Sequence, residues 1–279
     1  MLFRNMVYQI SKVNSVQPDF NYIKDVYEAC LNRYLQNPQN LSDALKSIDN
    51  GRRILTSERE VDTYISLYGA HHYYKLVEAY DALNLNRFNN TYIETFSYGC
   101  GAAADTCSLI SYCYKNNFSL LINNITLIEP SSTALERGIK YIQKSLPYQM
   151  FARSNIRTIY KLIGKLEYND IISNPEAIKL HVFSNVLDID SIDLSSLASI
   201  IYQTQKGSNY FICINPKNTE SKSRIDYFYN ILSNLFKLTD IDINDRSILR
   251  KQIWMMKYNR YTDRNPIYRY HRIFKADAI

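Results

Sequence analysis

From Thr91 onwards the sequence alternates between short apolar runs and amphipathic segments with helical periodicity. The apolar runs are residues 91–98, 125–130, 156–163, 179–189 and 209–216. The helical segments are residues 104–115, 131–146, 193–205 and 221–236. Strands that alternate with helices in this way form a parallel sheet covered by helices on both faces. We therefore expect residues 91–279 to form one α/β domain.

The two ends of the chain depart from this alternation. Residues 254–258 and 267–274 have strand-like patterns with no helix between them, which predicts a closing antiparallel hairpin. Residues 1–90 instead show helical periodicity, most clearly after Ser57, where Glu60 completes a capping-box pattern. We expect these 90 residues to form a helical extension or lid beside the sheet.

The net charge of +6 is concentrated at the C-terminus. Residues 250–279 contain Asp263 and Asp277 and eight basic residues: Arg250, Lys251, Lys257, Arg260, Arg264, Arg269, Arg272 and Lys275. The rest of the chain is therefore neutral overall. A basic end interleaved with tyrosines can bind nucleic acid through phosphate contacts and base stacking, or it can be a solvated strand and loop. The sequence leaves both interpretations open.

The sequence contains no membrane or secretion signal. No stretch reaches the roughly 18 uninterrupted apolar residues of a membrane span, and residues 1–15 lack the pattern of a signal peptide. The five cysteines are an odd number without CxxC spacing, which favours reduced thiols over disulfides or a zinc site. We expect a cytoplasmic protein with no membrane contact and no bound metal.

Two of the seven glycines form Gly99-Cys100-Gly101, between the first predicted strand and its helix. Glycine there permits a tight turn and lets the backbone approach a bound nucleotide, while the helix N-terminus offers free N–H donors. The next predicted strand ends in Glu129, where a carboxylate is placed to accept both hydroxyls of a ribose. Together these features indicate a nucleotide site at the carboxyl end of the sheet.

Three segments resemble motifs of the class I S-adenosylmethionine-dependent methyltransferases. They are Phe96-Ser97-Tyr98-Gly99-Cys100-Gly101, Leu127-Ile128-Glu129-Pro130-Ser131 and His181-Val182-Phe183-Ser184-Asn185-Val186-Leu187-Asp188. The paired strands at the C-terminus also resemble that family's reversed last strand. The resemblance covers roughly residues 90–276. It implies a Rossmann-like, mostly parallel sheet with an antiparallel last strand, S-adenosylmethionine as cofactor, and methyl transfer to an unidentified acceptor.

The resemblance assigns roles residue by residue. The glycine loop would wrap the methionine part of the cofactor, and Glu129 would hold its ribose. The end of the fourth strand would line the cofactor and substrate side, with Asp188 as a further candidate. The implied cofactor-binding residues are Ser97, Tyr98, Gly99, Cys100, Gly101, Glu129, Pro130, Ser184 and Asn185. No catalytic residue is implied, because such enzymes act mainly by placing the acceptor in line with the sulfonium.

Departures from the family pattern favour an alternative function. Ser97 stands where the family usually has an acidic residue, and residues 102–104 are alanines where a third glycine is usual, so that methyl groups would crowd the loop. The N/D-P-P-Y/F signature of enzymes that methylate exocyclic amines is also absent. The alternative is a non-catalytic protein of the same fold that binds nucleic acid or a protein, through its basic C-terminus or its helical N-terminus.

Other reactive side chains have ordinary interpretations. His71 and His72 are adjacent in a helix and point to different faces, so they form no metal site, and packing is favoured over substrate contact. His181 begins an apolar strand, which is typical of a structural histidine. Cys100 lies at a helix N-terminus, which lowers a thiol's pKa, but no base for a nucleophilic role is evident.

Overall fold

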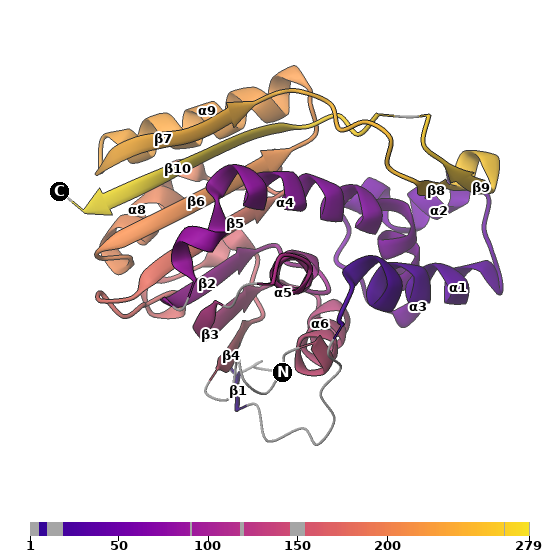
Figure 1. Ribbon diagram of the computed structural model, residues 1–279, viewed down its shortest axis with the longest axis horizontal. Helices are drawn as coiled ribbons and strands as arrows, with labels where there is room; N and C mark the ends of the chain where they lie inside the picture. Colours follow the sequence, from indigo (N-terminus) through magenta and orange to yellow (C-terminus); the bar gives the residue numbers. More distant parts are fainter. Residues whose placement is uncertain are drawn as a thin grey trace.

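The computed structural model describes residues 6–9, 19–89, 91–117, 120–145, 154–264 and 266–278. Within these residues the main sheet has eight strands in the order β1-β4-β3-β2-β5-β6-β10-β7 (Figure 1). Its strands are β1 Met6–Gln9, β2 Tyr92–Tyr98, β3 Leu121–Ile128, β4 Asn155–Ile159, β5 Ile178–Ser184, β6 Ser208–Asn215, β7 Phe236–Asn244 and β10 Tyr270–Ala278.

Strand direction follows the expected pattern. β4, β3, β2, β5 and β6 run parallel to one another. β10 lies between β6 and β7 and is antiparallel to both, while β1 is antiparallel to β4 at the other edge. The expected mostly parallel sheet with a reversed last strand is therefore confirmed.

The expected C-terminal hairpin is wrong in its pairing. β10 pairs with β7 and β6, not with residues 254–258. No apolar run predicts β7, because it is a largely exposed edge strand that carries Asp240 and Asp242. The segment around residue 254 belongs to a separate small hairpin formed by β8 (Ile253–Met255) and β9 (Arg260–Thr262).

Helices cover both faces of the sheet (Figure 1). One face carries α4 (Ala70–Leu83), α5 (Ala104–Lys115) and α6 (Ser132–Ser145), and the other carries α8 (Leu194–Thr204) and α9 (Thr219–Ser233). Alternate residues of a strand point to opposite faces. In β6, Ile212 and Ile214 join the apolar cluster under α4 and α5, while Phe211 and Cys213 join the cluster under α8 and α9.

The N-terminal part of the chain is mainly helical over residues 19–89, but Met6–Gln9 forms β1 of the main sheet, a strand that the expected helical extension over residues 1–90 did not include. Its elements are η1 Ile23–Glu28, α1 Ala29–Leu35, α2 Leu41–Ser47, η2 Asp49–Gly51, α3 Glu58–Tyr64, η3 Ile65–Gly69 and, after α4, η4 Leu85–Phe88. The capping box is present at the start of α3, where Ser57 Oγ accepts a hydrogen bond from Glu60 N at 3.2 Å and the Glu60 carboxylate accepts one from Ser57 N. Further short helical turns are η5 Ile163–Lys165, η6 Tyr168–Asp170 and η7 Met256–Tyr258.

Ion pairs fasten this helical extension to the sheet domain. Asp62 on α3 contacts Arg33 on α1 at 2.7 Å and Arg137 on α6 at 2.5 Å. Ser131, just before α6, donates its hydroxyl to Leu55 O at 2.5 Å. The extension is therefore joined to the sheet domain through Arg137 on α6 and through Ser131, which follows β3.

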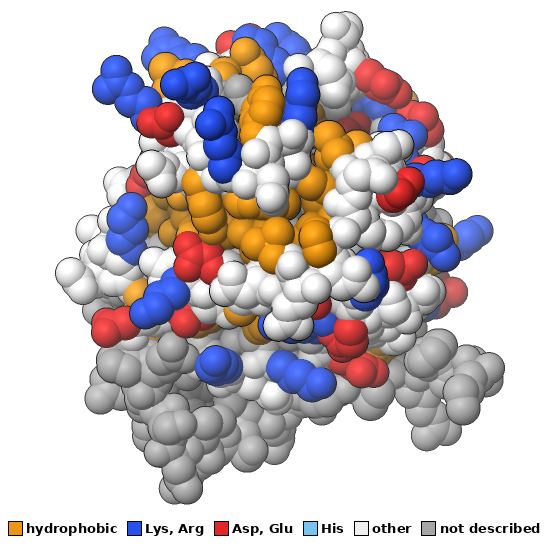
Figure 2. Space-filling model, turned by 90° about the vertical axis from the view of Figure 1, so that its right-hand side faces the viewer, with side chains coloured by type: hydrophobic (Ala, Val, Ile, Leu, Met, Phe, Trp, Pro, Cys, Tyr) orange, Lys and Arg blue, Asp and Glu red, His pale blue; other side chains and the backbone are white. Residues whose placement is uncertain are grey.

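Figure 2 shows the face that carries α1, α3 and the β8–β9 hairpin. Apolar side chains form a continuous area there, with lysines and arginines gathered along its upper edge. Exposed apolar residues of these elements and their connections include Ile54, Tyr258 and Tyr261. A protein or nucleic-acid partner on this side of the molecule stays a prediction. Of the described helices, none has the length and apolar character needed to cross a bilayer.

Candidate functional site

The loop between β2 and α5 is held against the end of β3. Gly99 N and Cys100 N both donate to Ile128 O, at 2.8 and 3.2 Å. Gly99 has φ +64°, and a Cβ there would lie 2.5 Å from Val186 Cγ1. Gly101 has φ +53°, and a Cβ there would meet no atom within 4 Å. Glycine at the first position is thus required for packing, whereas at Gly101 the backbone faces open space that a ligand can fill.

Glu129 lies directly beside this loop. Its Oε2 accepts a hydrogen bond from Gly101 N at 3.0 Å, and its Oε1 accepts one from Ser131 N at 2.9 Å. Burial raises the pKa of Glu129 above its ordinary value, and the two backbone donors oppose that rise. Each carboxylate oxygen keeps a lone pair for a further donor. The structure thus brings the sequence-predicted glycine loop and carboxylate together.

The central residue of the alanine run does not crowd the loop, contrary to what the sequence suggested. Ala103 is fully buried with φ +57°, and it faces Gly138 on α6. A Cβ on Gly138 would lie 2.9 Å from Ala103 Cβ and 2.8 Å from Ala102 C, so glycine on α6 provides the room that the loop lacks. Ala102 and Ala104 do line the recess at the loop.

A carboxylate that sequence reasoning missed lies behind the loop. Asp105, in the first turn of α5, is 4% exposed and lines the same recess as Gly101. Burial raises its pKa to about 6, while hydrogen bonds from Ser97 and from Thr106 N lower it. Within the described residues no lysine, arginine or histidine forms an ion pair with it. An acidic residue in a first helical turn is common, so its position alone gave no functional signal.

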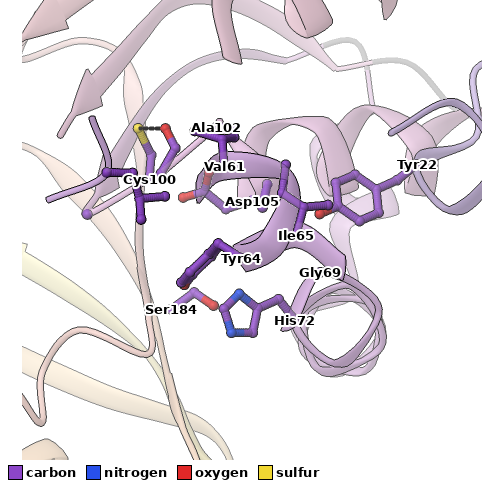
Figure 3. A pocket seen from close by; sticks show the side chains of 14 residues that line it. Tyr22, Val61, Tyr64, Ile65, Gly69, His72, Cys100, Ala102, Asp105 and Ser184 are labelled. Atoms are coloured by element: carbon purple, nitrogen blue, oxygen red, sulfur yellow. Dashed lines mark hydrogen bonds between the residues drawn. The ribbon is translucent and has the colours of Figure 1, made fainter. Parts of the chain in front are cut away.

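The recess at the loop is roofed by the helical extension (Figure 3). Its empty space is about 530 Å³, which includes space open to solvent. Tyr64 and His72 point toward Ser184 at the end of β5, and Tyr22 enters from the far side. The Tyr22 hydroxyl is buried and has no hydrogen-bond partner among the described residues. The remaining lining residues are Leu55, Val61, Ile65, Gly69, Gly99, Cys100, Gly101, Ala102, Ala104 and Asp105.

A larger cavity adjoins this recess and shares Tyr64 and His72 with it. Its empty space is about 1630 Å³, part of it open to solvent. Lys75 on α4 and Asn185 after β5 meet in its wall, where Lys75 Nζ donates to Asn185 Oδ1. The other lining residues are Asp49, Asn50, Gly51, Arg52, Leu67, Tyr68, His71, Asp188, Ile189, Pro216, Pro266, Ile267 and Tyr268.

Other predicted residues lie away from the recess or differ in chemistry. The Tyr98 side chain packs in the core under α8 and α9, where its hydroxyl pairs with His181 Nδ1 at 3.2 Å, so Tyr98 contributes only backbone near the loop. His181 also meets Asn209 and is structural, as expected. Pro130 lines neither cavity, and the same holds for Ser97 and for Glu129, which reaches the site through its hydrogen bond to Gly101 N. Burial raises the pKa of Cys100 well above its ordinary value, which corrects the expected lowering.

The basic C-terminus is partly neutralised by carboxylates on α9, on β7 and on β10 itself. Arg272 contacts Asp226 at 3.1 Å and Asp240 at 3.3 Å, and Lys275 contacts Asp277 at 2.7 Å. Tyr270 is buried, whereas Tyr268 is 59% exposed. Tyr258 and Tyr261 are exposed as well. Burial of Tyr270 therefore removes one ring of β10 from a stacking surface, and a nucleic-acid partner stays a prediction.

Comparisons with known proteins find similarity in structure only. No family model matches the sequence, and no curated protein matches it. One similar solved structure is the N-methyltransferase NodS from Bradyrhizobium japonicum with S-adenosyl-L-homocysteine, at TM-score 0.44, 9% identity, 84% of this chain and 98% of that chain. Another is an S-adenosylmethionine-dependent O-methyltransferase from Thermotoga maritima, at TM-score 0.42, 14% identity, 85% of this chain and 71% of that chain.

The sheet itself identifies the fold. From β4 onwards the strands follow the order β4, β3, β2, β5, β6, β10, β7. The last strand of the chain, β10, is antiparallel and lies between β6 and β7, the two strands of the main sheet that precede it in the sequence. The reversed strand distinguishes this arrangement from dinucleotide-binding Rossmann domains, and the glycine loop follows the strand at which the order reverses. The chain therefore has the Rossmann-like fold of the class I S-adenosylmethionine-dependent methyltransferases.

Proposed function

We propose that the protein transfers a methyl group from S-adenosylmethionine to an acceptor. The observation that carries the proposal is Glu129, which stands at the end of β3 and binds the Gly101 amide of the glycine loop. A carboxylate in this position of the sheet is placed to accept ribose hydroxyls, and the open side of Gly101 leaves room for the cofactor's chain. S-adenosylmethionine supplies an electrophilic methyl group when bound.

Asp105 gives the site a partner for the cofactor's ammonium group. A buried carboxylate without a cation destabilises the folded protein unless a ligand or a proton neutralises it. Asp105 lies in the recess, receives a hydrogen bond from Ser97, and has no cation beside it in the described chain. The family usually has an acidic residue at the position of Ser97. We therefore propose that Asp105 supplies this negative charge and that Ser97 orients its carboxylate.

The non-catalytic alternative has no observation that favours it over methyl transfer. It rested on Ser97, on the alanine run and on the absent N/D-P-P-Y/F signature. Asp105 can replace the charge missing at Ser97, and Gly138 makes room for Ala103 in the alanine run. The absent signature concerns only enzymes that methylate exocyclic amines. A protein or nucleic-acid partner remains compatible with either function. The five cysteines are free and buried, which fits the reducing, cytoplasmic compartment that we expect.

Calorimetric titration with S-adenosylhomocysteine tests the assignment of Glu129. We expect Glu129→Gln to weaken binding by about 10- to 100-fold, because it removes charge-assisted hydrogen bonds to the ribose. Glu136→Gln, on an exposed position of α6, is the matched control and should bind like the unmodified protein. Equal affinity in the two variants would remove Glu129 from the site.

A further inference from the structure

The larger cavity contains an amine in an unusual setting. Lys75 is 4% exposed, and its Nζ reaches Asn185 Oδ1 in the wall. Burial lowers the pKa of Lys75 to about 7, although the charge of Asp188 opposes this effect. A lysine of this kind is neutral in about half of the molecules at pH 7, and the neutral amine offers a lone pair to a proton donor.

The titratable groups around Lys75 leave it as the strongest base in the cavity. On its own helix, burial lowers the pKa of His71 to about 4 and that of His72 well below its ordinary value, so both are neutral and weakly basic. From the loop after β5, Asp188 faces the amine, and its Oδ2 accepts a hydrogen bond from Ser221 Oγ at 2.9 Å. Arg52 and Asp49, in the turn before α3, also line the cavity and contribute one positive and one negative charge.

The rest of the wall suits a flat aromatic molecule. Tyr68 stacks on His72 with ring centroids 6.1 Å apart and an interplanar angle of 11°, and Tyr64 meets both rings edge-on. Tyr268, 59% exposed, contributes another ring from the C-terminal part of the chain. Apolar surface comes from Leu67, Ile189, Pro216, Pro266 and Ile267. Aromatic side chains bind planar rings through stacked and edge-on contacts.

We propose that the methyl acceptor is a phenol that binds in this cavity with its hydroxyl at Lys75, which removes the hydroxyl proton. The inference rests on the proposed function and names the substrate class of the same site. A phenol has a pKa near 10, about three units above that of Lys75, so proton transfer to the amine is uphill but far less so than from an aliphatic alcohol. Tyr64 and His72 belong to both cavities, so the acceptor side adjoins the cofactor side.

The proposed reaction needs only the phenol, S-adenosylmethionine and Lys75. The phenol O–H bond breaks and its proton moves to Lys75 Nζ, which becomes an ammonium. The phenolate oxygen then forms the new O–CH3 bond, while the bond from that methyl group to the sulfur of S-adenosylmethionine breaks and its electron pair stays on sulfur. The products are the methyl ether and S-adenosylhomocysteine, and Lys75 later releases its proton to solvent.

A chromogenic phenol tests the inference without turnover. 7-Hydroxycoumarin would be titrated into protein saturated with S-adenosylhomocysteine, at about one unit below the pKa of the free phenol. We expect the bound probe to show the absorption band of its anion although the free probe is protonated. Lys75→Met should abolish that band, while Lys144→Met, at an exposed site on α6, should leave it unchanged.

Each outcome has a definite meaning. Binding of the probe without the anion band, in the unmodified protein, would overturn the role of Lys75 whether or not Lys75→Met folds. Failure of the probe to bind while S-adenosylhomocysteine binds would overturn the phenol assignment and leave the proposed function intact. Failure of S-adenosylhomocysteine itself would remove both. Persistence of the band in folded Lys75→Met would show that another group takes the proton.

Discussion

Two regions of the molecule differ in whether their ionisable side chains have an oppositely charged partner. In the β7–β10 region basic side chains have carboxylates beside them: the buried His271, whose pKa is lowered by burial, meets Asp242 at 2.5 Å, and the partly buried Arg272 meets Asp226 and Asp240. At the carboxyl ends of β2 and β5, Asp105 and Lys75 are as deeply buried, yet neither forms an ion pair within the described residues.

An unpaired buried charge points to a ligand only where it also lines a cavity, as Asp105 and Lys75 do. Lys179 on β5 is likewise buried without an ion pair within the described residues, but its amine donates to three backbone carbonyls. Burial of an unpaired charge destabilises a protein, so such a group persists where a proton or a ligand neutralises it. The pKa of Asp105 is raised to about 6 and that of Lys75 lowered to about 7, each toward its neutral form. We infer that these two groups mark the site, whereas the paired side chains of β10 stabilise the sheet.

The largest expected effect concerns Asp105 and pH. Its pKa is about 6 in the folded protein, above the ordinary 3.8, so its ionisation destabilises the fold progressively as pH rises from about 4 to about 6. Asp105→Asn should therefore match the unmodified protein near pH 4 and be more stable near pH 7, by up to about 3 kcal/mol. Urea unfolding at both pH values measures this, with exposed Asp190→Asn as control. Lower stability of Asp105→Asn at both values would refute the account.

The paired region should respond in the opposite sense. Arg272→Met keeps the side chain's apolar stem but leaves Asp226 and Asp240 without their partner. Both carboxylates are partly exposed, which limits the loss, and we expect destabilisation by about 1–2 kcal/mol in urea unfolding. A double-mutant cycle with Asp226→Asn isolates the pair. An unchanged free energy of unfolding would mean that these ion pairs do not stabilise the sheet.

The smallest effect distinguishes the two carboxylates of the site. Asp105→Asn should weaken S-adenosylhomocysteine by about tenfold, or about 1.4 kcal/mol, because the ammonium loses its partner. It should not change the affinity for 5′-methylthioadenosine, which lacks the amino-acid part. Glu129→Gln should weaken both ligands through the shared ribose. If Asp105→Asn weakened both ligands equally, the carboxylate would support the loop instead of the ammonium.

Much of the architecture was predictable because it depends on local pattern. The apolar runs locate β2 to β6, and Gly99, Gly101 and Glu129 meet because the carboxyl ends of neighbouring parallel strands lie at one edge. β7 was missed because edge exposure allows polar side chains to replace the apolar run.

The chemistry of the site was less predictable because it depends on burial and on contacts between distant segments. Lys75 and Asn185 are 110 positions apart, and no spacing rule connects them. Likewise, the sequence shows Asp105 as an ordinary acidic residue of a first helical turn, and only the fold reveals that it lies buried without a cation. Gly138, which makes room for Ala103, belongs to a different helix from the loop that it serves.

Calorimetric titration of the unmodified protein with S-adenosylhomocysteine tests the central claim most directly. The account predicts saturable binding with a micromolar dissociation constant, and an affinity that falls as pH drops through about 6 and Asp105 takes up a proton. Absence of binding across that pH range would contradict the claim that the glycine loop, Glu129 and Asp105 form a cofactor site.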